Sequence, residues 1–446
     1  MIARLLALTA LLVSVWTRHA QAQEQFRDNR YSIDLFTGPV LGSSRIVGLS
    51  GAYAAIATGI DGSVFNPAGY GERAEKEIRL WEFDVTAGVW FGGLFRNNDV
   101  DNNGKSGLSS TDVIQASGGL RMQFGPVGVG ATALGRMYSI RNGDGLTYAE
   151  VLLATVRSGL GIAWHDGGLV TGVGMSRTTF NLTQPGRDLV NFTGYGAEAG
   201  VLLRPKLERY RLGVVARTPV HSRPGNPEAT LDDDGVRRLD NFVLPASVRV
   251  PWEIDVGFAY QFGERRANVP WRSTRHLRRE LTQRIAQNGY FPPDAFGEAP
   301  YPPLAGTREQ AAETALSNEL EAQRRFRRHQ PRRYVLIAAD LVLYGPTKNG
   351  QSLSAFLVQQ PERSGEKISY GIRMGVESEV WQNRMKLRAG TYLEPSRTDR
   401  RYYRPHGTFG VDARLFDFWR WAMRATATVD GAPRYFNWGL ALGLWW

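Results

Sequence analysis

The sequence contains no cysteine, few histidines and no apolar run long enough to cross a membrane as a helix. Without cysteine, the chain has no disulfide framework, no thiolate metal site and no lipid-anchored N-terminal cysteine. A transmembrane helix needs about 20 consecutive, mainly apolar residues, and the apolar run from Leu5 to Val15 is shorter than that. A helical membrane protein and a fold held by disulfides are therefore both excluded.

The scarcity of histidine also argues against catalysis. Beyond residue 22 the chain contains only His165, His221, His276, His329 and His406, and it has no Gly-x-Ser-x-Gly motif. A barrel protease or lipase would need a histidine beside an aspartate or serine, and no pattern requires that arrangement here. We therefore predict no enzyme activity, no catalytic residues, no cofactor and no metal site.

The N-terminus has the three parts of a secretory signal peptide. Arg4 precedes the apolar run, and Ala20-Gln21-Ala22 supplies the small residues of a cleavage site. We predict a signal peptide over residues 1–22 and secretion across the inner membrane.

Glycine and aromatic residues are abundant: the chain has 50 Gly, 12 Trp and 17 Tyr. This composition suits alternating barrel segments better than two or three soluble domains. The clearest alternation is in the last segment, Arg434 to Trp446, where every even-numbered residue from Phe436 to Trp446 is apolar. In a strand these side chains share one face, as lipid contact requires.

The same alternation recurs upstream. A soluble sandwich strand can also alternate, so the repetition decides in favour of an all-β, 14-stranded antiparallel transmembrane β-barrel. The predicted strands are near 78–95, 113–124, 127–140, 147–164, 169–180, 192–204, 209–220, 246–262, 333–345, 367–380, 384–394, 406–415, 419–429 and 434–446. They form two blocks, strands 1–8 over 78–262 and strands 9–14 over 333–446.

The connections between these strands alternate between short and long. Short turns of such barrels belong to the periplasm and long loops to the exterior, which places both termini in the periplasm. The same parity places the long segment 263–332 in the periplasm. This insertion is basic, with 14 Arg against 8 Asp and Glu from Glu264 to Arg333, a surplus of +6. Helical patterns after Ser273 and Thr307 predict a helical hairpin, which either caps the pore or meets lipid headgroups, or binds a periplasmic protein.

Between the signal peptide and the first strand, residues 23–77 do not alternate. Small residues at high density allow close backbone packing, and a barrel of fourteen strands has a lumen wide enough to need water or a plug. We predict that 23–77 is a hatch inside the barrel. Its candidate residues are Arg45, Gly48, Gly51, Asn66, Pro67 and Ala68.

The run Arg45 to Gly69, with its Asn-Pro-Ala motif, resembles the hatch of the FadL family (OmpP1/FadL/TodX) of outer-membrane transporters for hydrophobic compounds. Further segments that resemble the family are Arg217-Thr218-Pro219-Val220, Leu244-Pro245, Ala339-Asp340 and Leu387-Arg388-Ala389-Gly390. The resemblance spans the mature chain except the insertion, and it implies passive uptake through a hatch-plugged barrel with lateral exit at a kinked third strand.

Two features bear on that implied mechanism. The third strand contains Gly128, Gly130 and Gly135, which are candidates for a bulge or bend, although glycine is frequent throughout this chain. The third outer loop, 181–191, is short, whereas fatty-acid transporters of the family carry a longer helical element there. A fatty acid is therefore in doubt as the solute, and an aromatic compound is the alternative.

Charged residues on the polar faces of the strands should point into the lumen and pair with each other, with the hatch or with water. We expect Arg45 to pair with a carboxylate of the wall. The candidates are Glu82, Asp84, Arg121, Glu198, Glu253, Asp255, Asp340, Arg373, Glu377 and Arg388, together with Lys386, Arg414 and Arg424.

The leading hypothesis is thus a channel of the Gram-negative outer membrane for small hydrophobic molecules. Its expected partners are a hydrophobic ligand, the lipid bilayer with lipopolysaccharide, and the barrel-assembly machinery. The rival hypothesis is a scaffold similar to the shuttle protein of type-nine secretion, which would bind a periplasmic or secreted protein through 263–332. No aromatic interleaving or binding-module motif supports nucleic acid as a partner.

Overall fold

The computed structural model describes most of the mature chain. The described residues are 25–36, 38–73, 81–92, 99–100, 102, 109–141, 147–226, 228–265, 267–271, 333–398, 402–418 and 421–445, with isolated residues between 279 and 322. The predicted signal peptide 1–22 and nearly all of the insertion 263–332 lie outside these residues, so both stay predictions.

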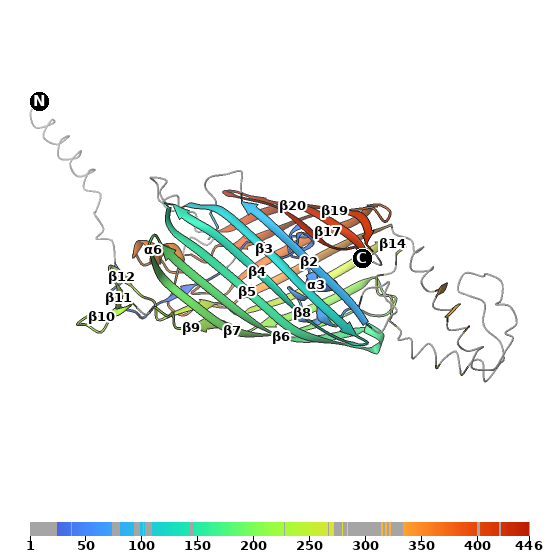
Figure 1. Cartoon of the computed structure of the whole chain (residues 1–446), viewed down its shortest axis with the longest axis horizontal. Helices are drawn as coiled ribbons and strands as arrows, with labels where there is room; N and C mark the ends of the chain where they lie inside the picture. The colour runs from blue at the N-terminus through green and yellow to red at the C-terminus, as the bar shows by residue number, and fades with distance from the viewer. Residues whose placement is uncertain are drawn as a thin grey trace, which may run out of the picture.

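Fourteen antiparallel strands form a closed barrel (Figure 1), and each is hydrogen-bonded to its neighbours around the ring. All fourteen predicted strands are present, with ends that differ by a few residues. The barrel strands are β2 (Trp81–Gly92), β3 (Ser109–Phe124), β4 (Val127–Arg141), β5 (Thr147–Trp164), β6 (Leu169–Gln184), β7 (Arg187–Leu203), β8 (Tyr210–Arg217), β14 (Glu253–Gly263), β15 (Tyr334–Tyr344), β17 (Ser369–Trp381), β18 (Met385–Pro395), β19 (Tyr403–Phe418), β20 (Trp421–Ala432) and β21 (Tyr435–Leu444).

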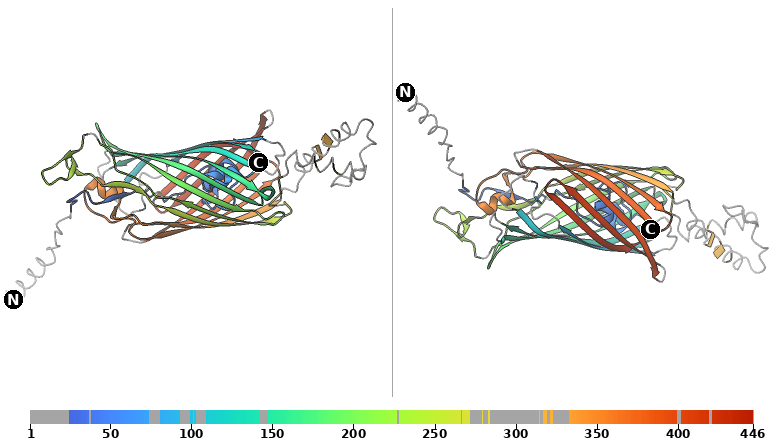
Figure 2. Two further views of the ribbon diagram at one scale, coloured as in Figure 1. Left: turned by 90° about the horizontal axis from the view of Figure 1, so that it is seen from below. Right: turned by 90° about the horizontal axis from the view of Figure 1, so that it is seen from above.

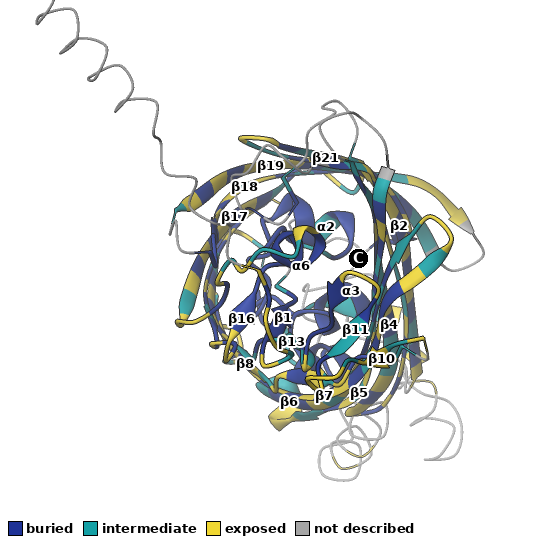
Figure 3. Cartoon of the chain, turned by 90° about the vertical axis from the view of Figure 1, so that its left-hand side faces the viewer, coloured by how far each residue is buried: buried dark blue, intermediate teal, exposed yellow. Residues whose placement is uncertain are grey.

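The alternation in the sequence becomes an inside and an outside. On β21, Trp438, Leu440 and Leu442 are exposed on the outer surface, whereas the intervening Asn437 and Ala441 are buried. The remaining barrel strands show the same division into buried and exposed faces (Figure 3). An outer surface this apolar suits lipid rather than water. In the described part of the chain, no helix has the length and apolar character needed to span a membrane.

The two ends of the barrel differ. We call the end with the tight turns 125–126, 165–168 and 382–384 the turn end, and the opposite end the loop end. Figures 1 and 2 show the C-terminus at the turn end, whereas the first described residues belong to the loop end. The expectation that both termini lie on one side is wrong for the described residues. The cause is β1 (Ser32–Asp34), which pairs with strands at the loop end.

Two prolines set the outer ends of neighbouring wall strands. The predicted strand 246–262 is divided at Pro251 into β13 (Ser247–Val250) and β14, and β8 ends before Pro219. Proline has no N–H to continue a ladder. Beyond the two prolines, β13 pairs with the short β9 (Val220–Ser222) instead of with the wall.

A cap covers the loop end of the lumen. A four-stranded sheet has the order β16 (Gly350–Gln351), β1, β13, β9, and a three-stranded sheet has the order β10 (Thr230–Leu231), β11 (Arg237–Leu239), β12 (Phe242–Val243). These sheets and the helix α6 (Leu353–Val358) make up what we call the mouth cap, and they bury a shared apolar core. Asp34 fixes the cap to the wall, because Arg397 Nε donates to its carboxylate at 2.8 Å and Thr347 Oγ1 at 2.6 Å.

The third outer connection is even shorter than the predicted loop 181–191. Strands β6 and β7 continue to Gln184 and from Arg187, so a two-residue turn joins them, with Gly186 at a φ of +87°. The two strands pair along nearly their full length. No capture element is therefore built by this connection.

Candidate functional site

The hatch is a chain of very short helices inside the barrel (Figure 3). It contains α2 (Ser44–Gly48), α3 (Gly59–Ser63) and the 3-10 helix η1 (Pro67–Tyr70), and nearly all of its residues are buried. Such short helices are not stable by themselves. Contacts with the wall therefore have to hold the hatch in place.

The Asn-Pro-Ala motif both starts a helix and fastens it to the wall. Asn66 Oδ1 accepts a hydrogen bond from the Ala68 N–H at 3.0 Å, and Pro67 occupies the first turn, where no N–H is needed. Asn66 Nδ2 donates to the carbonyl of Ala54 in the hatch at 2.9 Å and to that of Val201 in β7 at 3.2 Å. A fully buried amide thus has all three bonds made.

Glycines of the wall leave room for the hatch backbone. A methyl group at Gly128 of β4 would overlap the Tyr70 carbonyl, and one at Gly200 of β7 would overlap Asn66. The same holds along β5, β6 and β8. We call these five positions the glycine seat: Gly128, Gly161, Gly172, Gly200 and Gly213.

The predicted kink at the third strand is not found. Strand β4 pairs with β5 without a register shift from Val127 to Ile140, and the irregularity of its ladder with β3 lies at Thr111 to Ile114. Gly128 and Gly130 face the hatch, and the space they leave is filled by Tyr70. Gly135 faces outward, with open space beside it. Gly128 and Gly130 therefore serve packing against the hatch, and the ladder with β5 continues without a register shift at Gly135.

The ladder is instead incomplete between β7 and β8. Pairing runs only from Glu198 opposite Arg217 to Leu203 opposite Leu212, so the outer part of β7 extends beyond its neighbour. Beyond that point, the Thr218 N–H bonds the Ala197 carbonyl, and Val220 packs over the inward glycines of β7.

Charged residues hold the hatch on the other side of the barrel. As predicted, Arg45 pairs with a wall carboxylate: Arg45 Nε lies 3.1 Å from Glu377 Oε2. The carboxylate of Asp340 in β15 accepts from the N–H groups of Tyr53 and Ala54 at 2.8 and 2.9 Å. Burial opposes the charge on Arg45, but Glu377, Tyr53 and Tyr334 together raise the pKa of Arg45 above its ordinary value. Burial raises the pKa of Tyr53 to about 12.

A series of basic and acidic side chains in turn connects Glu377 of the wall back to the hatch. Arg388 bonds Glu377 at 2.6 Å and binds both oxygens of Asp412 at 2.6 and 2.7 Å. Arg424 continues from Asp412 at 3.6 Å to Asp61 of α3 at 3.1 Å. We call this set the charge seat, in order Arg45, Glu377, Arg388, Asp412, Arg424 and Asp61.

The predicted lumen charges do point inward. Asp84 accepts from the Ile60 N–H at 2.8 Å, and Arg121 donates to the Gly69 carbonyl at 2.9 Å and pairs with Glu82 at the same distance. The remaining ion pairs are Glu198 and Glu253 with Arg217, Asp255 with Arg373, and Arg414 with Asp417. Lys386 lies over the ring of Trp445.

Gly48 and Gly51 of the hatch complete the predicted set. Gly48 ends α2 against the backbone of Gly410, and Gly51 has a φ of +74°, which suits glycine. The sequence analysis missed Asp61, Asp412, Arg136, Arg157 and Arg211 as lumen residues. For the four on strands, the alternation that selected the other charges already gave the signal.

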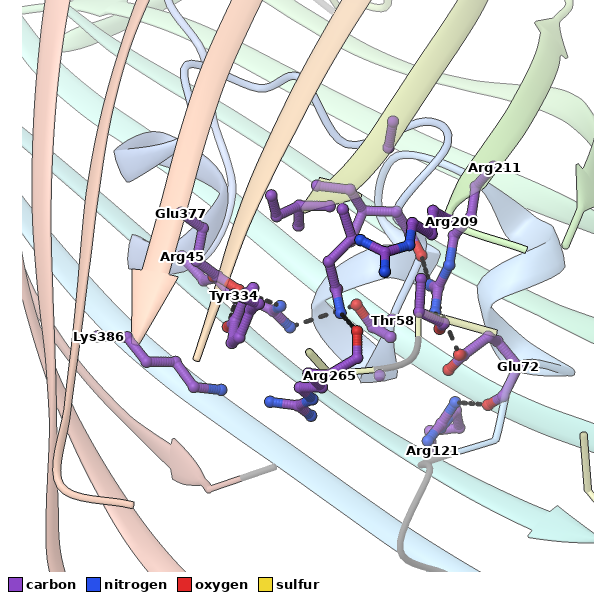
Figure 4. Close-up of a pocket in the computed structure, with 16 residues that line it drawn as sticks. Arg45, Thr58, Glu72, Arg121, Arg209, Arg211, Arg265, Tyr334, Glu377 and Lys386 are labelled. Carbon is purple, nitrogen blue, oxygen red and sulfur yellow. Dashed lines mark hydrogen bonds and ion pairs between the residues drawn. The ribbon is translucent and has the colours of Figure 1, made fainter. Parts of the chain in front are cut away.

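Two cavities lie on opposite sides of the hatch. The outer one is lined by Val64 and Phe65 of the hatch, and the inner one by Ile56 and Thr58. Figure 4 shows the inner cavity, at the turn end, with basic side chains around it. Its lining includes six basic and two acidic residues: Arg45, Arg121, Arg209, Arg211, Arg265 and Lys386, with Glu72 and Glu377. Among the described residues, no group of acidic and histidine side chains could hold a metal.

In comparisons with known proteins, the chain is similar to solved structures only. No family model and no curated protein matches the sequence. A FadL homologue from Pseudomonas aeruginosa has a TM-score of 0.49 at 11% identity, over 92% of this chain and 98% of the other. The monoaromatic hydrocarbon channel CymD has a TM-score of 0.47 at 8% identity, covering 92% and 97%. The toluene transporter TodX from P. putida has a TM-score of 0.45 at 11% identity, with the same coverage.

Proposed function

We propose that this chain is a FadL-like channel of the Gram-negative outer membrane that passes small hydrophobic molecules down their concentration gradient. The observation that carries the proposal is a hatch that separates two cavities inside a closed barrel with an apolar exterior. The outer cavity has an apolar part, which includes Leu35, Val40 and Leu153, and a charged part formed by Arg157, Arg217, Glu253 and Arg373. An apolar solute gains free energy when it leaves water for such a surface.

Passage requires the hatch to shift, because its backbone fills the space left by the glycine seat. The outer cavity of about 120 Å³ and the inner one of about 80 Å³ are small and lie apart, with the hatch between them. Among the described wall strands, β7 and β8 share the shortest ladder, Glu198–Leu203 opposite Leu212–Arg217, and the outer part of β7 is bonded by the loop residues Gly225 and Asn226 instead. We propose that a lateral exit, if the solute takes one, uses this short ladder and not β4.

A disulfide lock tests whether the hatch moves. Ser50 Oγ in the hatch lies 2.8 Å from Thr408 Oγ1 in β19, and the native chain contains no cysteine to interfere. The variant combines Ser50→Cys with Thr408→Cys. Uptake of toluene is measured in vesicles with a lipopolysaccharide outer leaflet, because plain phospholipid lets such solutes through unaided.

We expect the oxidised variant to block uptake and the reduced variant to restore it. The two single-cysteine variants, treated with the same oxidant, are the controls. Equal uptake by the oxidised and reduced double variants, with the crosslink verified, would show that the solute does not pass the hatch.

The scaffold hypothesis rests on the basic insertion 263–332. Nearly all of that segment lies outside the described residues, so no contact in the structure favours a protein partner. Crosslinking from the insertion in cells remains the direct test of that alternative.

A further inference from the structure

A single arginine stands out in the space between the mouth cap and the hatch. Arg136 lies on the inner face of β4, opposite Gln115 of β3 and Leu153 of β5. It lines a small cavity under the mouth cap, and its exposed fraction is 2%. The cavity is lined by the apolar side chains Leu35, Phe36, Val100, Tyr138, Val151, Leu153 and Leu353 and by the polar side chains Asp34, Ser352, Ser364, Arg397 and Thr398.

The guanidinium of Arg136 is without a counter-ion in the described part of the chain. Its Nε and Nη2 atoms are buried and have no hydrogen-bond partner there. A buried cation normally persists only when it is paired and hydrogen-bonded. Because the guanidinium of arginine stays protonated in proteins, it cannot escape by losing its charge.

The other arginines of the same region are each matched by an acid. Arg397 lies 2.8 Å from Asp34, Arg217 lies 2.6 Å from Glu253, Arg373 lies 3.6 Å from Asp255, and Arg157 lies 4.0 Å from Glu198. Among these five arginines, Arg136 is the one without an ion pair to a carboxylate of the described residues. A buried guanidinium without an acid partner is the complement of a ligand that carries a negative charge.

The adjoining cavity provides room for an apolar body. The cavity under the mouth cap and the outer cavity above the hatch share Leu35, Phe36 and Leu153. Leu134, the inward neighbour of Arg136 on the same strand, belongs to the outer cavity. A ligand held by Arg136 can thus extend along these side chains toward Val64 and Phe65 of the hatch.

We propose that Arg136 binds the carboxylate of a compact apolar acid, so that this channel selects small monocarboxylates over neutral hydrocarbons. The inference rests on the proposed function and narrows its solute class. A planar guanidinium binds a carboxylate through two parallel hydrogen bonds. The cavities are small, about 40 and 120 Å³, so the apolar body has to be short or a single ring.

Equilibrium binding to the full chain in nanodiscs tests the proposal, with empty nanodiscs as the blank. The probes are benzoate, its neutral analogue benzyl alcohol, toluene and inorganic phosphate. The variants are Arg136→Gln, which removes the charge, and Arg136→Lys, which keeps it. The matched control is Arg177→Gln, because Arg177 is an exposed arginine on the outer face of β6.

We expect wild type to bind benzoate at least about tenfold more tightly than benzyl alcohol, as a charge-assisted pair of hydrogen bonds predicts. Arg136→Gln should abolish that preference and leave toluene binding unchanged, Arg136→Lys should keep part of it, and Arg177→Gln should change nothing. Phosphate should bind much more weakly than benzoate, since it has no apolar body.

Two results would overturn the inference: unchanged benzoate affinity in folded Arg136→Gln, or phosphate binding as tightly as benzoate. Failure of the proposed function looks different, because wild type would then bind neither toluene nor benzoate. If toluene binds and passes but Arg136→Gln leaves the benzoate preference intact, the proposed channel function is supported and the proposed acid specificity is rejected.

Discussion

The hatch meets two different kinds of wall. On β4 to β8 glycines bring the two backbones together, and a methyl group at Gly172 or Gly213 would overlap the hatch main chain. Arginines of β5 and β8 add hydrogen bonds to hatch carbonyls on this side. On β17 to β19 the fit is looser, since a methyl group at Gly375 would lie 2.6 Å from the Leu49 carbonyl and one at Gly410 would lie 3.2 Å from Gly48. There the charge seat holds the hatch instead.

The difference between the two seats indicates how the hatch can be released. A steric seat is insensitive to salt and pH, whereas a chain of ion pairs depends on each member. Losing one member leaves its partners charged and buried. The charge seat is therefore the side on which a single substitution should weaken the hold on the hatch most.

The largest effect is expected from removing the middle of the charge seat. Arg388→Met leaves Glu377 and Asp412 without their shared partner, and breaking a buried pair in this way destabilises by about 3 to 5 kcal/mol. The free energy of unfolding in urea, measured on detergent-solubilised protein, gives the value. The control is Arg414→Met, because Arg414 pairs with the exposed Asp417 and such pairs contribute less than about 1 kcal/mol. Equal losses in the two variants would contradict the charge seat.

A glycine swap on one strand tests the steric seat. Gly128→Val forces a side chain into the Tyr70 carbonyl, and overpacking of this kind destabilises by about 1 to 3 kcal/mol. Gly135→Val changes the same strand by the same atoms on the outer face, where nothing lies within 4 Å. We expect the unfolding free energy to fall in the first variant and not in the second. A fall in both would point to strand propensity as the cause.

A smaller effect is expected at the motif that joins the hatch to the glycine seat. Asn66→Ala removes the cap of η1 and the bond to the Val201 carbonyl, and losing a cap costs about 1 kcal/mol. Hydrogen exchange of the Ala68 amide should speed up, while exchange in β17 and β18 stays unchanged. Uniform acceleration across the barrel would instead indicate global destabilisation.

The smallest effect is expected outside the hatch, in the mouth cap. Hydrogen bonding from Arg238 lowers the pKa of Asp232 below its ordinary value. A depressed carboxyl pKa stabilises the folded state above the unfolded pKa, and this contribution is lost as pH falls through the folded value. Titration of Asp232 by NMR should move toward the ordinary value in Arg238→Gln. Because the pair is solvent-exposed, barrel stability should not change measurably.

Much of the architecture could be predicted from the sequence, because strand alternation is a local property. The fourteen strands, the inward charges and the pairing of Arg45 with a wall carboxylate all followed from it. The sequence analysis took 246–262 as one strand although Pro251 marks a break in it, and it took the glycines of β4 as a bend. A glycine leaves space, and whether that space becomes a bend or is filled depends on what packs against it, here Tyr70.

The sequence by itself determined that the chain closes into a barrel, because an apolar face repeated on fourteen segments has to meet lipid. It also determined that many charges point inward. Only the tertiary structure decided which charges neutralise each other, because partners such as Arg45 and Glu377 are brought together from distant segments by closure of the barrel. It also decided that Arg136 forms no ion pair with an acid of the described residues, a property set by geometry and invisible in the order of the residues.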